Sequence, residues 1–390
     1  MRIKYKMSDK YKTISEFGAR PISTHAWSGD GNHLAVSMNN KEVQILKKGS
    51  VAGNWDNVAT LNQHDLVVRG IDWAPKTNRI VTCSEDRNAY VWNLQDDGTW
   101  KQSLVLLRIN RAATCVKWSP EENKFAVGSG ARIVSVCYFE DQMDWWVAKH
   151  IKKPIRSTIT TIDWHPNNCL LATGSSGFKV RVYSGYVKEV EEKPSVTPWG
   201  SKMPFQNMMA EFSNSPHGGG WIHSVSFSSD GNRLAWVAHD SSISVADATK
   251  GDAPNFEVYR LATNELPFLS CIWLSLNTLV TAGHGCKPLA YNVDDSGHIT
   301  FMSEIDIMKS ECGGKNAGAK AISIFHSLDK HGKNYTATKL NTIHQKQISC
   351  IQILTGDKSK AEQISTSGGD GKVVVWNIKT IEEDVQALKI

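Results

Sequence analysis

Short segments in which apolar and polar residues alternate recur along the chain at a nearly constant step. The clearest marker of each segment is a terminal aromatic residue, which is followed by a turn rich in Ser, Pro, Asp, Gly and Asn. These aromatic residues are Trp27, Trp73, Trp118, Trp164, Phe227 and Trp273, at steps of 46, 45, 46, 63 and 46 residues. A seventh segment of the same kind, residues 348–354, follows after a longer gap. The chain is therefore a repeat protein with about seven units.

Each unit continues with further short strands. A second apolar segment follows the first turn, as at residues 80–83 and 170–173, and a third alternating segment follows another tight turn, as at 89–92 and 180–183. Strands with a two-residue period that recur every 40–50 residues are typical of four-stranded propeller blades. The pattern predicts an all-β fold in which residues 1–390 form one seven-bladed β-propeller. We expect residues 11–17 to supply the outer strand of the last blade and so to close the ring. A pair of β-sandwiches, the alternative, does not account for so constant a step.

The period breaks at two places, and both breaks predict insertions. The step of 63 residues contains residues 186–215, expected between blades 4 and 5. Among its apolar residues, Trp199, Met203, Phe205, Met208 and Met209 have the sequence context of exposed side chains. A loop with this composition either folds back onto a blade or is offered to a partner, and the sequence leaves both alternatives open.

The second insertion, residues 296–342, is expected between blades 6 and 7. Within it Ala321, Ile324, Phe325 and Leu328 follow the i, i+3, i+4, i+7 spacing of one helix face. The spacing predicts a short amphipathic helix flanked by glycine-containing segments. We expect an arm that becomes ordered in the groove of a partner, and the alternative is a helix packed on its own propeller.

Composition narrows the possible functions. The formal net charge of +5 is spread along the chain and forms no basic stripe, which argues against nucleic acid as a partner. No uninterrupted apolar run approaches 18 residues, so membrane insertion is not expected, and the basic N-terminus leads into no apolar segment of a signal peptide. The eight cysteines are scattered without a Cys-x-x-Cys pair, which favours a reducing cytosol.

No constellation for catalysis emerges from the sequence. Residues 217–220 (HGGG) resemble the oxyanion-hole loop of some esterases, but the Gly-x-Ser-x-Gly nucleophile elbow of such hydrolases is absent. No dinucleotide loop and no paired Cys/His spacing occurs either. We therefore expect no catalytic residue, no cofactor and no metal site.

The basic run 149–156 offers a different chemistry, because Lys149, Lys152, Lys153 and Arg156 form a cationic loop suited to an acidic partner. The alternative for this run is a solvated loop between blades.

Two units carry a more specific motif, which resembles the WD-repeat family. His64, Asp86 and Trp92 have the spacing of that family in one unit, and His344, Asp370 and Trp376 have it in another. The resemblance implies that the aspartate orients the histidine in a tight turn and that the tryptophan braces the blade. Other units depart from the motif: Asn40, Arg132, Gly177 and Gly285 stand where the aspartate is expected, and only Asp240 retains it. All of these residues are therefore interpreted as structural.

Longer segments resemble one group of WD-repeat proteins. They are residues 70–76 (GIDWAPK), 79–92, 107–140, 149–157 (KHIKKPIRS), 163–168 and 188–205. Together they are similar to the WD-repeat subunits of the actin-related protein 2/3 complex, which nucleates branched actin filaments. The resemblance implies a cytoplasmic, non-catalytic scaffold of the actin cytoskeleton. It implies as partners actin-related protein 2, the small subunits, the actin filament and the acidic tails of nucleation-promoting factors. The helix of the second insertion, with Ala321, Ile322, Ile324, Phe325 and Leu328, is then the filament-binding arm. The main alternative is a WD-repeat adaptor of the ubiquitin-ligase or chromatin type, which binds a peptide across its central channel.

Overall fold

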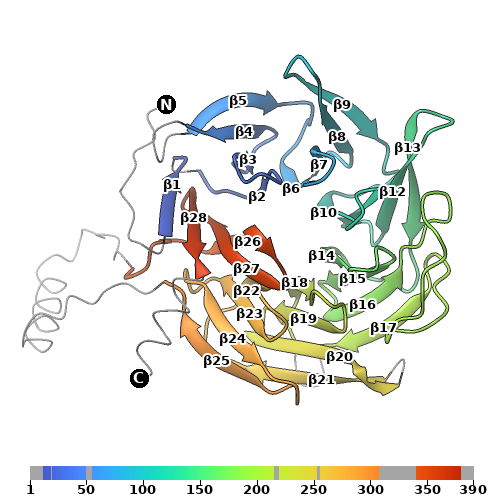
Figure 1. The fold of residues 1–390 in the computed structure, drawn as a ribbon, viewed down its shortest axis with the longest axis vertical. Coiled ribbons are helices and arrows are strands. Elements are labelled where there is room, and N and C mark those ends of the chain that lie inside the picture. Colours follow the sequence, from blue (N-terminus) through green and yellow to red (C-terminus); the bar gives the residue numbers. More distant parts are fainter. Residues whose placement is uncertain are drawn as a thin grey trace, which may run out of the picture.

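Seven four-stranded antiparallel sheets stand around a common axis as the blades of a propeller (Figure 1). The computed structural model describes residues 12–18, 20–49, 55–214, 219–252, 255–306 and 340–378. The architecture confirms the all-β, seven-bladed propeller that the repeat predicts. In the first six blades the strand that lies nearest the axis ends at the recurring aromatic residue.

The strands of the first three blades follow one another from the axis outward. Blade 1 contains β2 (Thr24–Trp27), β3 (His33–Ser37), β4 (Val43–Lys48) and β5 (Trp55–Leu61). Blade 2 contains β6 (Val68–Trp73), β7 (Arg79–Ser84), β8 (Ala89–Leu94) and β9 (Trp100–Val105). Blade 3 contains β10 (Ala113–Trp118), β11 (Lys124–Ser129), β12 (Val134–Glu140) and β13 (Trp145–Ile151).

The next three blades repeat this order. Blade 4 contains β14 (Ile159–Trp164), β15 (Leu170–Ser175), β16 (Lys179–Ser184) and β17 (Met208–Ser213). Blade 5 contains β18 (Ile222–Phe227), β19 (Arg233–Ala238), β20 (Ser242–Asp252) and β21 (Asn255–Ala262). Blade 6 contains β22 (Phe268–Trp273), β23 (Thr278–Gly283), β24 (Leu289–Val293) and β25 (Ile299–Glu304).

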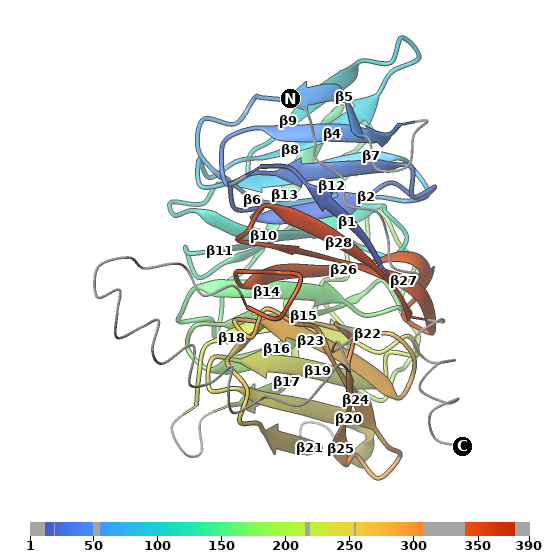
Figure 2. The same cartoon turned by 90° about the vertical axis from the view of Figure 1, so that its left-hand side faces the viewer.

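Blade 7 combines the two ends of the described chain. Its inner strands are β26 (Ile348–Asp357), β27 (Lys360–Gly368) and β28 (Lys372–Asn377), and its outer strand is β1 (Lys12–Glu16). β1 pairs antiparallel with β28 from Lys12 opposite Trp376 to Glu16 opposite Lys372, and the two strands lie side by side in Figures 1 and 2. The prediction that this N-terminal segment closes the ring is confirmed.

The core consists of layers between blades. Seven apolar clusters occur among the described residues, and each combines side chains from two neighbouring blades. The cluster between blades 1 and 2, for example, joins Val43 and Ile45 to Ile71, Trp73 and Ile80. Successive side chains of a strand point to opposite faces of its sheet, and each blade has buried apolar side chains on both faces. Each blade therefore needs a neighbour on both sides.

The WD motif of blade 2 forms a continuous hydrogen-bonded chain. The Trp92 indole N–H donates to Thr82 Oγ1 (3.0 Å), Thr82 lies 2.8 Å from His64 Nε2, and His64 Nδ1 donates to Asp86 (2.7 Å). Burial raises the pKa of Asp86, but the hydrogen bonds from His64 and from the Asn88 backbone N–H outweigh it and lower that pKa below its ordinary value. The motif is therefore a brace between the inner strands and the turn, with a threonine that the sequence motif did not reveal.

Blade 7 repeats this brace, and blade 5 replaces part of it. In blade 7 His344 lies between Asp370 (3.0 Å) and Thr366 (2.8 Å), and Trp376 donates to Thr366. The hydrogen bonds of blade 5 differ: the Trp236 indole N–H donates to Asn214, and the Asn214 side chain donates to Asp240 (3.0 Å). An asparagine thus takes the place of the histidine.

Arg132 does not occupy the aspartate position of the WD motif in blade 3, where the sequence placed it. Ala131 occupies the turn position of Asp86 in blade 3, and Arg132 occupies the next position, as Arg87 does in blade 2. Both arginines have a positive φ, 73° at Arg87 and 61° at Arg132, which is a shared requirement of this turn.

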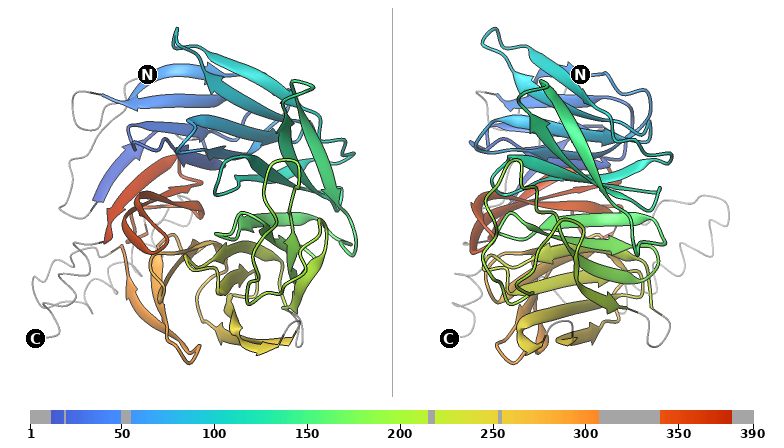
Figure 3. Two further views of the ribbon diagram at one scale, coloured as in Figure 1. Left: turned by 45° about the vertical axis from the view of Figure 1, so that its right-hand side comes forward. Right: turned by 90° about the vertical axis from the view of Figure 1, so that its right-hand side faces the viewer.

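The first insertion lies within a blade, whereas residues 186–215 were expected between blades 4 and 5. Its last part forms β17, which pairs with β16 from Lys179 opposite Ser213 to Tyr183 opposite Met208. The additional residues therefore form the loop between the third and fourth strands of blade 4 (Figure 3). The distance between two aromatic markers spans four connections, so it cannot show which of them is lengthened.

This loop is folded back onto the ring through Trp199. The Trp199 side chain has no exposed surface, packs against Phe227 and Phe256, and donates its indole N–H to the Gly231 carbonyl (2.8 Å). Met203 and Met209 are buried in the same cluster, while Met208 is 40% exposed. The loop thus contributes to the layer between blades 4 and 5.

The second insertion overlaps blade 6 at its start. Residues 299–304 of the expected span 296–342 form β25, the outer strand of that blade. The expected helix with Ala321, Ile322, Ile324, Phe325 and Leu328 lies outside the described residues, as do residues 1–10.

We predict that Trp199→Ala lowers the free energy of unfolding by about 3–5 kcal/mol, because it removes a large buried side chain and leaves a cavity. Urea unfolding followed by circular dichroism measures this change. Trp145→Ala is the matched control, since the Trp145 side chain is 56% exposed. Equal destabilisation by the two variants would contradict the role assigned to Trp199.

A candidate anion-binding pocket between blades 3 and 4

Four arginines line one pocket at the junction of blades 3 and 4. Arg108 and Arg111 come from the loop before β10, Arg132 from the turn between β11 and β12, and Arg156 from the loop before β14. The pocket has a volume of about 1160 Å³, and no aspartate or glutamate is among its lining residues. We call this pocket the arginine pocket.

The walls of the arginine pocket are small and polar or aliphatic. Ser157, Thr158 and Ser176 provide hydroxyl groups, and Ile109 and Ile133 provide apolar surface. The four arginines are exposed at the protein surface. Guanidinium groups bind carboxylates and phosphates through paired hydrogen bonds, so the pocket is suited to an anionic ligand.

The loop that carries Arg108 is held in place by backbone contacts. The Arg108 guanidinium donates to the Ala148 carbonyl, and His150 Nε2 lies 2.8 Å from the Leu107 carbonyl. Burial lowers the pKa of His150, and the nearby charges of Lys152 and Arg108 lower it further. The positive charge of this region at neutral pH therefore comes from arginine and lysine side chains.

The cationic run 149–156 is divided by the structure. Lys149 points away from the arginine pocket: it forms an ion pair with Glu189 (2.8 Å) and lies over the ring of Tyr138. Lys152 and Lys153 are exposed in the turn after β13, and Arg156 alone lines the pocket. Of the four residues predicted to bind an acidic partner, only Arg156 lines the arginine pocket. The other three arginines of the pocket were not predicted from the sequence as binding residues.

A signal for the missed arginines is present in the repeat itself. Loops before the first strand and turns between the second and third strands recur at fixed positions in every unit, and they lie at the same face of the ring. Mapping residues 108–111, 132 and 156 onto these positions would have brought the four arginines together.

The central channel presents a different electrostatic picture. Charged residues that line it form internal pairs: Lys117 with Asp72 (3.0 Å), Lys358 with Asp163 (2.6 Å) and Arg69 with Glu85. Lys358 belongs to the turn between β26 and β27 and reaches Asp163 of blade 4 across the channel. These pairs leave little unsatisfied charge for a peptide bound across the channel, as the adaptor alternative requires.

The described residues contain no group of three or more His, Cys, Asp or Glu side chains arranged to hold a metal ion. No helix in the described part of the chain is long and apolar enough to cross a membrane. Of the HGGG segment at 217–220, the first two residues lie outside the described ranges.

Comparison with known proteins gives consistent matches. The family model described as WD domain, G-beta repeat matches residues 55–93 and 149–184. "Actin-related protein 2/3 complex subunit 1A-A" of Xenopus laevis is 53% identical over 379 residues, which cover 97% of this chain and 100% of the relative. "Actin-related protein 2/3 complex subunit 1" of Schizosaccharomyces pombe is 39% identical, covering 92% and 97%. "Actin-related protein 2/3 complex subunit 1B" of Arabidopsis thaliana is 37% identical, covering 94% and 97%.

We predict that the double variant Arg111→Ala/Arg132→Ala weakens binding of an acidic peptide about tenfold, because two charged hydrogen-bond donors are lost. A fluorescein-labelled peptide rich in Asp and Glu, titrated with the full chain and followed by fluorescence polarisation, measures the change. The dependence of the dissociation constant on salt should also become shallower.

Lys149→Ala is the control for this experiment, since its cation is already paired with Glu189. It should change the affinity less than twofold. A larger loss in Lys149→Ala than in the double variant would assign the acidic peptide to the other face of the loop.

Proposed function

The chain belongs to the family of subunit 1 of the actin-related protein 2/3 complex, and from this membership we propose that it is a non-catalytic scaffold subunit of such a complex in the cytoplasm. The similarity to subunit 1 proteins along nearly the whole chain carries the proposal. The matches cover 92–97% of this chain and 97–100% of these relatives, so the similarity is not confined to one or two blades. We propose actin-related protein 2 and the small subunits of the complex as its neighbours.

The proposed mechanism is positional. A ring whose blades are braced on both sides keeps its surface loops at fixed distances from one another. Neighbouring subunits that bind different blades would then be held in a constant relative orientation. Such a role in actin nucleation and branching needs complementary surfaces and no bond chemistry.

The arginine pocket is the proposed contact for acidic tails of nucleation-promoting factors. Its four guanidinium groups lack acidic partners among the residues that line the pocket, and its aliphatic walls can receive side chains between the carboxylates. Charge complementarity of this kind raises the association rate and selects acidic partners. Lys152 and Lys153, which are exposed in the adjacent turn, add to the same field.

The arm at residues 321–328 is the proposed contact with the actin filament. This proposal depends on the apolar spacing of Ala321, Ile324, Phe325 and Leu328 together with the family membership. Burial of each large apolar side chain contributes about 1.5–3 kcal/mol, and ordering of the arm offsets part of this gain.

We predict that the tagged full-length chain, expressed in its native cells, is recovered in stoichiometric amounts with actin-related proteins. Quantitative mass spectrometry of the purified assembly measures the ratio. The Arg111→Ala/Arg132→Ala variant should assemble normally, while activation of nucleation by acidic tails falls several-fold in a pyrene-actin assay. Recovery of the chain without actin-related proteins would contradict the scaffold proposal. Normal activation of the variant would contradict only the assignment of the pocket.

We predict that Phe325→Ala weakens binding of the assembled complex to actin filaments about tenfold, because the largest side chain of the apolar face is lost. Cosedimentation at increasing filament concentrations measures this affinity. Ser323→Ala, which lies off the apolar face in helical periodicity, is the matched control. Unchanged affinity in Phe325→Ala would exclude this side chain as an anchor.

A further inference from the structure

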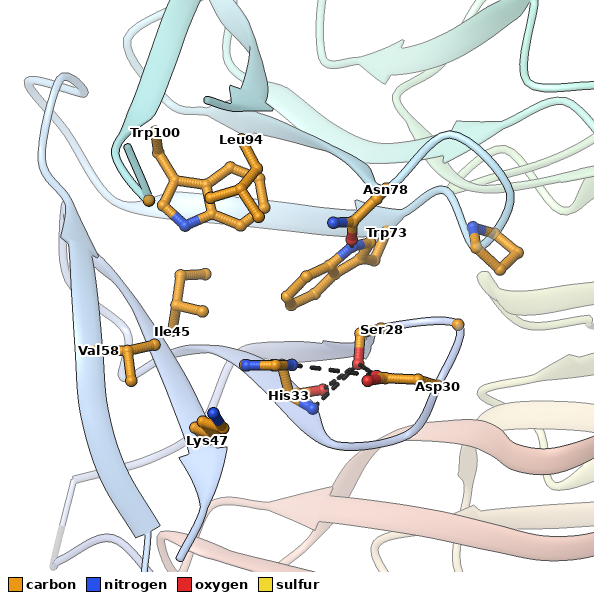
Figure 4. Close-up of a pocket in the computed structure, with 13 residues that line it drawn as sticks. Ser28, Asp30, His33, Ile45, Lys47, Val58, Trp73, Asn78, Leu94 and Trp100 are labelled. Carbon is orange, nitrogen blue, oxygen red and sulfur yellow. Dashed lines mark hydrogen bonds and ion pairs between the residues drawn. The ribbon is translucent and has the colours of Figure 1, made fainter. Parts of the chain in front are cut away.

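A second cavity lies at the outer part of the junction between blades 1 and 2. It has a volume of about 490 Å³, and the indole rings of Trp73 and Trp100 form one wall (Figure 4). Val58 and Leu94, which are 50% and 45% exposed, lie at its margin. We call this space the tryptophan cleft.

The pair of indoles in the tryptophan cleft belongs to a series. In each of the first three blades a tryptophan at the end of the inner strand packs against a tryptophan of the outer strand. The centroid distances are 5.8 Å for Trp27–Trp55, 5.7 Å for Trp73–Trp100 and 5.9 Å for Trp118–Trp146. The three pairs can therefore be compared position by position.

In two other junctions a cation from the preceding blade covers the indole. The residue six positions after the aromatic marker of blade 2 is Arg79, whose guanidinium carbon lies 5.0 Å from the Trp118 ring centroid and 5.9 Å from that of Trp146. The corresponding residue of blade 3, Lys124, lies 5.2 Å from the Trp164 centroid. A positively charged side chain over an indole face is a favourable arrangement.

The same position in blade 5 also carries a cation that spans its junction. Arg233 donates to Asn277 (3.2 Å) and to Asp295 (3.4 Å), both of blade 6. Four blades thus have a basic residue at this position: His33, Arg79, Lys124 and Arg233.

Blade 1 has the shortest side chain of the four at this position. His33 is shorter than arginine or lysine, and its ring lies 6.4 Å from the Trp73 ring at an interplanar angle of 40°. Within the described ranges, no lysine or arginine lies over Trp73 or Trp100. Trp73 itself is only 6% exposed, but the cavity beside Trp73 and Trp100 holds no side chain of the length of Arg79.

An anionic group stands beside this space. Asp30 lines the tryptophan cleft and its side chain is 55% exposed. Hydrogen bonds from Ser28 Oγ and from the Asn32 backbone N–H lower the pKa of Asp30 to about 2, so the carboxylate is ionised at physiological pH. Lys47 lines the cleft as well and is exposed.

We propose that the tryptophan cleft binds an arginine side chain of a partner polypeptide. The guanidinium lies over the Trp73 and Trp100 rings, as that of Arg79 lies over Trp118 and Trp146, and its charge is balanced by Asp30. The aliphatic part of the arginine contacts Val58 and Leu94. An acidic residue next to the arginine in the partner pairs with Lys47, which otherwise opposes the binding of a cation.

Fluorine NMR of the full chain labelled with 5-fluorotryptophan tests this proposal. The resonances of the two indoles are assigned with Trp73→Phe and Trp100→Phe, and the probe is the dipeptide acetyl-Asp-Arg-amide. Both resonances should shift in a saturable manner. The corresponding citrulline dipeptide, which has nearly the same shape without the charge, should bind about tenfold more weakly. The corresponding norleucine dipeptide, which has an uncharged aliphatic side chain, should also bind about tenfold more weakly.

Two variants probe the site from the protein side. Asp30→Asn should weaken the arginine dipeptide several-fold and leave the citrulline dipeptide unchanged, because only the charge of the carboxylate is removed. His33→Arg should abolish the shifts, since it places an arginine in the cleft, as Arg79 of blade 2 places one over Trp118 in the next junction. His298→Arg, at an exposed position of blade 6, adds the same charge elsewhere and should bind like the unmodified chain.

Four results would overturn the proposal. Equal binding of the arginine and citrulline dipeptides, or of the arginine and norleucine dipeptides, would show that the cleft does not recognise a cation. Full binding by His33→Arg would place the dipeptide outside the cleft. The absence of any shift at the Trp73 and Trp100 resonances would exclude the cleft as a binding site.

Discussion

The pairing of β1 with β28 is the constraint on which the whole ring depends. It joins residues more than 350 positions apart in sequence and supplies the fourth strand of blade 7. Because each apolar layer lies between two blades, an open ring would expose the layers on both sides of the gap to water. A buried histidine reinforces this junction: His25 of blade 1 lies 2.7 Å from Ser365 and 2.8 Å from Ser367 of blade 7. Burial lowers the pKa of His25 to about 3, so its imidazole is neutral in the closed ring.

Polar side chains complete the junctions that apolar packing begins. The braces around Thr82 and Thr366 hold the inner strands of two blades to their turns, and Asn214 makes a related connection in blade 5. At other junctions the connection is a cation over an indole, and Lys124 is both buried over Trp164 and paired with Glu191 of the insertion. A buried charge needs such a partner to offset its loss of hydration. Variation in these polar contacts, on a constant apolar framework, makes the seven junctions chemically different from one another.

This difference between junctions is the physical basis of the partner binding that we propose. Where the chain supplies its own counter-groups, as in the central channel, the surface is satisfied internally. The arginine pocket and the tryptophan cleft are the opposite case, because each presents one half of an interaction: four guanidinium groups without carboxylates, and two indoles without a covering cation. They lie at different junctions of a rigid ring, so two partners bound there would be held at a fixed separation. The scaffold role that we propose needs this arrangement.

The sequence predicts the repeat, the number of blades and the strand that closes the ring, because alternation and aromatic markers are local properties of each unit. It also identified His64, Asp86 and Trp92 as a structural set. Only the tertiary structure placed the long loop inside blade 4, since the step between markers does not show which connection has grown. The arginine pocket and the absence of a cation over Trp73 likewise depend on side chains of two neighbouring blades, which meet only when those blades pack. Local periodicity encodes strands, whereas the chemistry of a junction is decided by which side chains two adjacent blades bring together.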